Sequence, residues 1–435
     1  MKLNIFTMAA IIFMTANYGG LFAQENEINT EPENGKPAPE ETSEAAVLSG
    51  YIRNYTGVLA KGGNDYAIIQ NTFDIRLKKQ TENAAFKANS IVYHNPEKDK
   101  DIELMLREAY VDLFFSSMDI RIGKQQIIWG KADGVFITDI ISPKDMREFL
   151  LPDFEEIRIG VTGAKSNLYL NDHALEIIWL PVFSAAIPPE AGSIWRPEPS
   201  FPVSPVFHND KEEVDGSLKN SEVFAKYSLM TSLIDLELIG GYTWDDEPVM
   251  HAYKTIDPAT KQITALDIYP EYHRLTAGGG SFTFTIDPLV LRGEAAYYKG
   301  KYFNSTDPAL LDSFVKKDYV NYMAGADFTI WDIKNSAQFI QKIILRHTSD
   351  LHDKKFQNLA TYLISRDFFN ETLNLQFFVY YDIDNKSSLM RPKITYKYAD
   401  GFDILAGANI FTGSEGKFGQ YNKNDMVYTK ITYHF

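Results

Sequence analysis

Met426-Val427-Tyr428-Thr429-Lys430-Ile431-Thr432-Tyr433-His434-Phe435 is the stretch of sequence that decides the fold. Val427, Ile431, Tyr433 and Phe435 share one parity, and Tyr428, Lys430, Thr432 and His434 share the other. Alternation with a period of two predicts a β-strand with one apolar and one polar face. The stretch runs to a terminal aromatic residue, and nothing follows that would cover the apolar face. Because lipid covers such faces in transmembrane β-barrels, we predict a barrel strand here.

The same alternation recurs along the chain after residue 46. In the segment 373–382, for example, every second residue is Leu, Leu, Phe, Val or Tyr. Such segments are about 10 to 14 residues long, which is enough to cross the bilayer core at a tilt. They begin near residues 47, 65, 83, 103, 118, 157, 173, 219, 233, 271, 288, 318, 334, 356, 370, 387, 402 and 424. We therefore predict an all-β protein, a transmembrane antiparallel β-barrel over residues 47–435 with about 18 strands (16–20).

The connections between these segments alternate in length. Every second one is very short: Thr81-Glu82, Ser116-Ser117, Asn171-Asp172, Thr231-Ser232, Asp287-Pro288, Trp331-Asp332, Asp367 and Ala399-Asp400-Gly401. Long connections are expected at about 130–156, 184–218, 246–270, 301–317 and 414–423. This parity predicts short periplasmic turns, long external loops and both ends of the barrel on the periplasmic side.

The first 46 residues predict export across the inner membrane. Residues 1–23 hold Lys2, a short apolar run and Ala23 at the expected cleavage point, which is typical of a signal peptide. An N-terminal membrane anchor is the alternative. Residues 24–46 are acidic, contain Pro and have few apolar side chains, so we expect a disordered periplasmic tail. Together with the barrel, these features predict the outer membrane of a diderm bacterium.

The composition excludes several other classes of protein. No run of about 18 apolar residues occurs after the leader, which excludes a helical membrane protein. The formal net charge of −15 argues against nucleic acid as a partner. The chain has no Cys, so neither a disulfide nor a thiolate metal ligand is possible.

The predicted loop 130–156 is too apolar for a solvated surface loop. It contains Val135, Phe136, Ile137, Ile140, Ile141, Phe149, Leu150 and Phe154, which must be covered. We expect it to fold inward and to narrow or plug the pore, as selective barrels require. The alternative is that it packs against other external loops. The candidate constriction residues are Trp129, Lys131, Asp133, Asp139, Asp145, Arg147, Glu148, Asp153 and Glu155.

Strand parity also predicts the charges that line the pore. The candidates are Arg53, Arg76, Glu108, Asp112, Arg121, Arg391, Lys393, Lys397 and Lys430. Closure of the barrel places the last strand beside the first, so most of the basic residues gather on one wall. A basic wall that faces an acidic loop would favour anionic or zwitterionic polar solutes. In the alternative, the charges pair across neighbouring strands and only keep the lumen wet.

The sequence contains no pattern of catalytic or metal-binding residues that would indicate an enzyme. The eight His residues are scattered over turns, loops and strand ends, and no G-x-S-x-G motif occurs. The run His347–Asp353 could bind a metal on a loop, but we prefer a solvated turn there. We therefore expect no catalytic residue, no cofactor and no metal ligand.

Two runs in and before the predicted loop 130–156 resemble a known protein family. Arg121–Gly134 and Thr138–Phe149, with Leu151–Glu155 and Arg158, resemble an uncharacterised porin-like outer-membrane family. That family is catalogued as a domain of unknown function near the alginate-export barrels. The resemblance is weaker at Arg292–Gly300. It implies a large monomeric barrel for export or passage of solutes, without a settled substrate or any catalytic residue.

We therefore expect a porin-like channel for passive passage or export of polar or anionic solutes, restricted by the inward loop. The expected partners are outer-membrane lipid, a small-molecule or oligomeric solute, and the barrel-insertion machinery, which would recognise the last strand ending at Phe435. Two alternatives stay open. The barrel could be a conduit for hydrophobic molecules, or a surface binding protein that acts through its long loops, such as the Pro- and Trp-containing 184–218.

Overall fold

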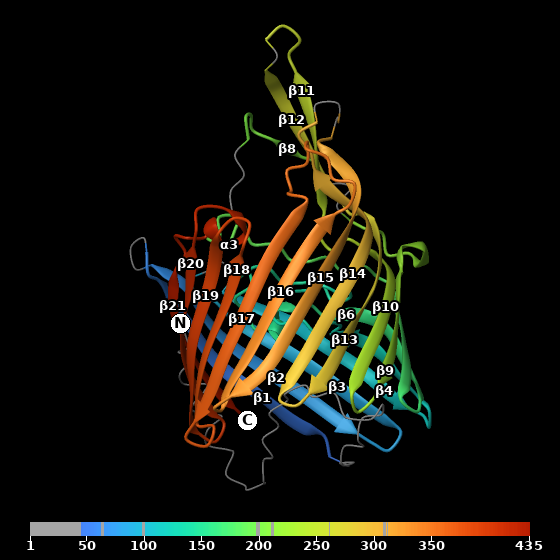
Figure 1. Cartoon of the computed structure of the whole chain (residues 1–435), viewed down its shortest axis with the longest axis vertical. Helices are drawn as coiled ribbons and strands as arrows, with labels where there is room; N and C mark the ends of the chain where they lie inside the picture. Colours follow the sequence, from blue (N-terminus) through green and yellow to red (C-terminus); the bar gives the residue numbers. More distant parts are fainter. Residues whose placement is uncertain are drawn as a thin grey trace, which may run out of the picture. The chain divides into compact units, whose positions relative to one another are not determined.

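β-Strands build almost the whole barrel domain (Figure 1). The computed structural model describes residues 45–61, 65–97, 101–196, 201–209, 213–260, 262–307, 310 and 312–435. The predicted signal peptide, and the predicted tail up to residue 44, lie outside the described residues.

The strands of the barrel are the following. They are β1 (Val47–Leu59), β2 (Tyr66–Gln80), β3 (Ala84–His94), β4 (Ile102–Phe114), β5 (Met118–Gln125), β6 (Val161–Leu170), β7 (His173–Leu180), β9 (Glu222–Met230), β10 (Ile234–Trp244), β13 (Arg274–Ile286), β14 (Leu289–Asn304), β15 (Phe314–Ile330), β16 (Ile333–Ile344), β17 (Phe356–Phe368), β18 (Leu373–Asp382), β19 (Ser387–Ala399), β20 (Phe402–Thr412) and β21 (Met426–His434).

Each barrel strand pairs in antiparallel fashion with its neighbours along the chain, and the first strand pairs with the last. The closing register runs from Tyr51 opposite His434 to Leu59 opposite Met426. The sheet has 18 strands, which confirms the predicted fold class and strand number. Each strand begins within about four residues of its predicted start, because the alternation that covers one face with lipid is visible in the sequence.

A second sheet was not predicted. Residues 246–270 were expected to be an external loop, but they contain the hairpin β11 (Val249–Ile256) and β12 (Ile263–Glu271). β8 (Val206–Phe207) joins β12 in parallel, so the long 184–218 connection contributes a strand as well. Figure 1 shows β11 and β12 extending beyond the ends of the barrel strands. The hairpin forms because its Val, Ile, Tyr and Thr residues favour strands even outside a barrel.

Two further boundaries differ from the expectation. The strand β14 ends at Asn304 and β15 begins at Phe314, so much of the predicted loop 301–317 is strand. Asp367 lies inside β17, and the turn follows at residues 369–372. Pairing of β14 with β15 continues past an irregularity between Tyr298 and Lys301 through a mixture of Lys and aromatic residues, and pairing of β17 with β18 continues through Asp367 and Asn374.

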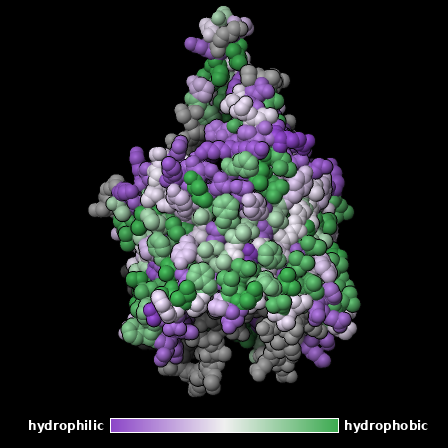
Figure 2. Space-filling view, viewed as in Figure 1, coloured by the Kyte–Doolittle hydropathy of each residue, from purple (hydrophilic) through white to green (hydrophobic). Residues whose placement is uncertain are grey.

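The alternation of exposure follows the predicted parity on β21. Val427, Ile431 and Tyr433 are 57%, 43% and 41% exposed, whereas Tyr428 and Lys430 are buried. Figure 2 shows apolar side chains gathered over the outer face of the strands, with hydrophilic residues at the rims. The apolar parity therefore faces outward, where lipid would cover it.

The helices among the described residues are short. They are α2 (Phe154–Ile157), α3 (Gly416–Gly419) and the 3₁₀ turn η2 (Leu218–Asn220). In the part of the chain that the structure describes, no helix is long and apolar enough to cross a membrane.

Candidate functional site

The connection between β5 and β6, residues 126–160, is the centre of the candidate site; we call it the β5–β6 loop. It leaves and re-enters the barrel at adjacent points, since Gln125 and Val161 are register partners. At this base the Gln126 N–H donates to Glu108 Oε1 at 2.9 Å. The Gln126 side chain donates to the backbone oxygen of Arg158 at 2.6 Å, which joins the two ends of the loop.

The first half of the loop is fastened to β14. The Glu294 carboxylate accepts hydrogen bonds from Lys131 N at 2.7 Å and from Thr138 N at 2.6 Å. It also accepts the Thr138 hydroxyl at 2.6 Å. Two residues before it, Arg292 Nη2 lies 2.6 Å from Asp133 Oδ2. Both charged side chains of Arg292-Gly293-Glu294 therefore bind the loop, and we call this group of contacts the β14 clamp.

Two glycines allow the loop to approach the wall this closely. Gly130 has a φ of +98°, and a Cβ there would lie 2.8 Å from Glu294 Oε1. Gly134 has a φ of +82°, and a Cβ there would lie 2.7 Å from the Tyr380 hydroxyl oxygen. Positive φ and lack of space both demand glycine at these positions. This explains the two glycines of the run Trp129–Gly134.

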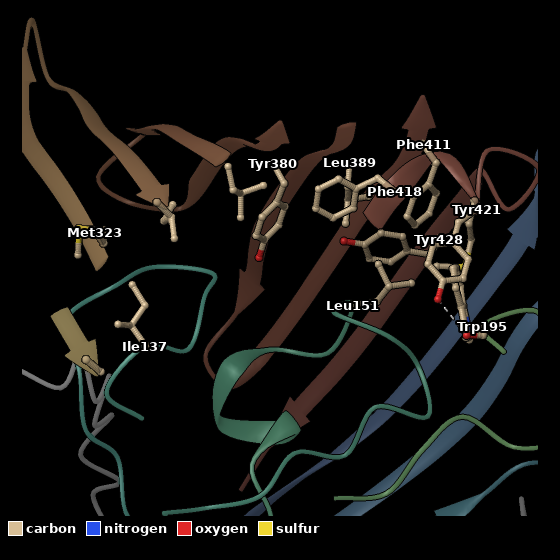
Figure 3. Packing of buried hydrophobic residues seen from close by; sticks show 14 of the residues in the cluster. Ile137, Leu151, Trp195, Met323, Tyr380, Leu389, Phe411, Phe418, Tyr421 and Tyr428 are labelled. Carbon is tan, nitrogen blue, oxygen red and sulfur yellow. Dashed lines mark hydrogen bonds between the residues drawn. The ribbon is translucent and has the colours of Figure 1, made fainter. Parts of the chain in front are cut away.

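Apolar residues in the second half of the loop are covered by the wall and by other loops. Phe149 lies with its ring centroid 4.7 Å from that of Tyr421, and it also contacts Phe411 and Phe418. Figure 3 shows Leu151 in the same cluster as residues from β18–β21 and from the β7–β9 connection. Trp195 belongs to that connection, and its backbone oxygen accepts from the Tyr421 hydroxyl at 3.2 Å. The apolar side chains of the loop are therefore covered both by barrel strands and by another loop.

The acidic end of the loop meets basic residues of β1, β19 and β21. Arg53 Nη1 lies 2.6 Å from Glu156 Oε1, and Lys430 Nζ lies 3.7 Å from Asp153 Oδ2. Arg391 donates to the backbone oxygens of Leu150 and Leu151 at 3.0 and 2.6 Å. These contacts join the acidic end of the loop to three strands of the barrel; that they form a selective wall stays a prediction.

This charge arrangement shifts the carboxyl groups of the loop in different directions. Lys430, followed by Lys393 and Arg391, holds the pKa of the Asp153 carboxyl well below its usual range. Burial raises the pKa of Glu148 from 4.5 to about 7, and the opposing effect of Lys430 does not cancel it. At neutral pH the site therefore contains one carboxyl that is firmly ionised and one that titrates.

A cavity of about 400 Å³ lies against this end of the loop. Its walls include Arg53, Gln70, Tyr93, Glu103, Glu148 and Lys430. These residues come from the first four strands, the last strand and the β5–β6 loop, so the cavity is bounded by wall and loop together. Ile68, Leu151, Ile194, Trp195 and Met426 also line it, so the cavity has both polar and apolar walls.

Other predicted pore-lining residues lie elsewhere and pair across or along the sheet. Arg121 binds Asp112 on the neighbouring strand with Nε and Nη2 at 2.7 and 3.0 Å. Arg76 Nε lies 2.8 Å from Asp74 on the same strand. Lys397 stands six positions along β19 from Arg391, which is about 20 Å. The contacts of Arg121 and Arg76 are local charge pairs, as in the alternative that the sequence left open.

The remaining candidate constriction residues also have defined partners. Trp129 is buried, and its Nε1 donates to Glu176 Oε1 at 2.6 Å. Asp139 accepts from Arg158 Nε at 2.8 Å, and Glu155 is exposed beside Asp153. Arg147 bridges Asp145 and Glu103 at 2.7 and 2.8 Å. The role of all these residues in lining a pore stays a prediction.

Sequence reasoning missed the residues that fasten the loop. Glu294, Arg292 and Glu176 were not among the candidates, although parity alone would have placed them on the polar face of their strands. One signal could have pointed to Arg292 and Glu294: the segment Arg292–Gly300 weakly resembles the same protein family that the loop resembles. Nothing in the pattern tells which loop these side chains contact.

Comparisons with known proteins agree with the fold. A family model described as "Protein of unknown function (DUF1302)" matches residues 56–435. No curated protein matches the sequence. Among solved structures, Pseudomonas aeruginosa OccK2 (OpdF) has a TM-score of 0.52 at 8% identity, with 90% of this chain and 98% of that chain covered.

Two further structures from the same organism are similar. The outer membrane protein OpdK has a TM-score of 0.51 at 10% identity, covering 90% of this chain and 99% of its own. OccK8 (OprE) has a TM-score of 0.50 at 11% identity, covering 91% and 99%. At such low identity these likenesses show the fold alone, which is that of outer-membrane porin-like β-barrels.

Proposed function

Since this chain belongs to the DUF1302 family of proteins of unknown function and has the fold of porin-like outer-membrane barrels, we propose that it is a channel. It passes polar solutes passively across the outer membrane as a monomer, without a chemical step. The β5–β6 loop narrows the path, and the charged cavity beside it selects the solute. Its last strand, which ends at Phe435, is the element that the barrel-insertion machinery recognises.

One observation carries this proposal: the loop is bonded to strands that are far apart in the ring. It starts at β5, is fastened to β14 by Glu294, and contacts β1 and β21 through Glu156 and Asp153. A segment tied to such separated strands has its shortest route through the space that the ring encloses. A barrel of this size leaves a wide lumen unless a loop restricts it, so a constriction supports selective passage.

The basic wall beside the cavity is the basis on which we propose anionic or zwitterionic solutes. Arg53, Arg391, Lys393 and Lys430 stand opposite Glu148, Asp153 and Glu156. Glu148 is partly protonated near neutral pH, because its pKa is raised to about 7. Within this group, four basic side chains face two ionised carboxylates and one that is partly protonated, and opposed charges across a narrow path orient and admit anionic or zwitterionic solutes. The lining of the cavity also contains Arg147 and the carboxylates of Glu97, Glu103, Asp145 and Glu190.

A conduit for hydrophobic molecules is less well supported. Its greasy site would have to be open, but Phe149, Trp195 and Tyr421 pack on each other and on Phe411. A surface binding role through the long loops has no specific contact in its favour. We therefore retain the polar channel as the single proposal.

The test is solute uptake by liposomes that contain the folded, heat-modifiable barrel. A neutral hexose and the hexuronate of the same size are compared by osmotic swelling. The proposal predicts swelling with both solutes and a faster rate with the hexuronate. If liposomes with folded protein swell with neither solute, the channel is contradicted. If the neutral sugar enters faster than the hexuronate, only the anion preference is contradicted.

A further inference from the structure

Two imidazole rings meet at the base of the three-stranded sheet. His251 lies on β11, and His273 follows the end of β12. Their Nε2 atoms are 2.7 Å apart. Glu271, the last residue of β12, offers a carboxylate oxygen, and the three possible ligand atoms all lie within 4.8 Å of one another. Two His nitrogens and one carboxylate oxygen are a donor set that divalent transition metals take.

A second carboxylate fixes the orientation of one of the rings. Asp312 Oδ2 lies 2.7 Å from His251 Nδ1, and Ala252 N donates to the backbone oxygen of Asp312 at 3.0 Å. An ionised carboxylate accepts, so the proton of His251 sits on Nδ1 and its Nε2 presents a lone pair toward His273. A carboxylate that binds the far nitrogen of a ligating His is the usual support of a metal site.

Aromatic rings enclose the pair. The Tyr302 ring stacks on His273 with a centroid distance of 4.1 Å, and the Phe314 ring lies 5.5 Å from His251. His251 is only 6% exposed. Such surroundings restrict the rings and limit access of water, which strengthens binding of an ion by the few donors present.

From this arrangement we propose a site for Zn²⁺ or a similar divalent transition ion, held by His251, His273 and Glu271. Zinc–nitrogen bonds of about 2.0–2.1 Å in a tetrahedral site place two ligand nitrogens about 3.3 Å apart. The rings then need to separate by about 0.6 Å from their present 2.7 Å. Water would fill the remaining position.

The ion would fasten the β11–β12 hairpin to the barrel. His251 is on the hairpin, His273 directly precedes β13, and Asp312 belongs to the β14–β15 connection. The ion therefore joins the hairpin to the start of β13, and the contact of Asp312 with His251 links this site to the β14–β15 connection. This role is independent of solute passage, and neither proposal requires the other.

The test is zinc binding by equilibrium dialysis against a chelator of known affinity, with the full-length barrel in detergent and without a His tag. We expect the wild type to retain one more zinc ion per chain than the double variant His251→Ala/His273→Ala. Asp312→Asn should weaken binding by about 10–100-fold, as removal of a supporting carboxylate does elsewhere. Cobalt substitution, read from the visible absorption of a tetrahedral centre, reports the coordination directly.

His208→Ala is the matched control, because His208 lies beside the same sheet and its Nε2 contacts the Asp267 carboxylate at 2.8 Å, outside the cluster. The control should bind zinc as the wild type does. Equal zinc binding by the wild type and the folded double variant would overturn the proposal, as would no retention by the wild type. Heat modifiability shows whether each variant is folded. If the double variant does not fold, the single variant His273→Ala takes its place.

Discussion

Glu294 accepts hydrogen bonds from both the backbone N–H and the hydroxyl of Thr138, each at 2.6 Å. The two residues are 156 positions apart in the sequence. Since the same carboxylate also binds Lys131 N, a single side chain of the wall satisfies several donors of the β5–β6 loop. Buried N–H groups need such partners, so Glu294 determines the path of this half of the loop.

Replacement of Glu294 by Ala should release the first half of the loop. The buried donors of Lys131 and Thr138 would lose a charged acceptor, at a cost of about 3 kcal/mol to the docked loop. Limited trypsin digestion of the folded barrel measures this release, through cleavage after Lys131. Glu82→Ala, in the exposed β2–β3 turn, is the control and should leave the digestion pattern unchanged. Protection equal to wild type in Glu294→Ala would show that the β14 clamp is dispensable.

Neutralisation of the basic wall should change ion selectivity. Lys430→Gln and Lys393→Gln each remove a positive charge near Asp153. Removal of one unit charge at about 4 Å changes the interaction energy with a passing ion by about 1 kcal/mol. This corresponds to a decrease of about fivefold in the anion-to-cation permeability ratio. The reversal potential in a salt gradient measures that ratio. Lys397→Gln, on the same strand and far from the loop, is the matched control; an equal shift in all three variants would argue against a local selective wall.

Selectivity should also depend on pH through Glu148. Its pKa is raised to about 7, chiefly by burial, so the carboxyl is neutral below that pH and ionised above it. Anion preference should therefore fall as the pH rises from 6 to 8. The contribution of Glu148 to stability has the same sign: it is complete below the ordinary value of 4.5 and is lost as the pH rises through about 7.

Glu148→Gln is the variant that tests this assignment. The amide cannot ionise, so the reversal potential should become independent of pH over that range. The charged groups facing Glu148 are Lys430, Glu156, Asp145 and Arg53, and all are retained in the variant. An undiminished pH dependence would mean that another group titrates.

Phe149→Ala should loosen the second half of the loop. Truncation of a fully buried Phe costs about 3–5 kcal/mol, and the half-buried ring of Phe149 should contribute about 2 kcal/mol. Hydrogen exchange of residues 146–152 measures this effect as faster exchange. Phe369→Ala is the control, because Phe369 has a similar φ of 54° against 56° but is 77% exposed in a turn. Unchanged exchange in Phe149→Ala would contradict the anchoring role of the ring.

The strands of the barrel could be predicted because lipid imposes a simple rule on every one of them. An apolar residue such as Val427 must point outward and a neighbour such as Lys430 must point inward, which leaves a period of two in the sequence. The ends of β14 and β15, where Lys and aromatic residues are mixed, do not follow that rule. Neither does the β11–β12 hairpin, for which no part of the pattern indicated a strand outside the barrel.

The site was only partly predictable, since its contacts join residues far apart in the chain. Parity predicts Arg53, Arg391 and Lys430 on one wall, and the pairing of β1 with β21 brings the strands of Arg53 and Lys430 side by side. The partners of the loop depend on how it packs, and neither Glu294 nor His273 carries a local mark of its contact. Spacing alone could not have joined His251 to His273, because the hairpin that aligns them was itself unforeseen.

The most direct test of the central claim is the single-channel conductance of the wild type and of a variant that lacks residues 132–154. The remaining connection still joins Gln125 to Val161, which are register partners, so the barrel strands keep their ends. We predict ion-selective conductance in the wild type and a clearly larger, less selective conductance in the deletion. Identical conductance in the two folded barrels would contradict a constriction by the β5–β6 loop, and silence from both would contradict the channel itself.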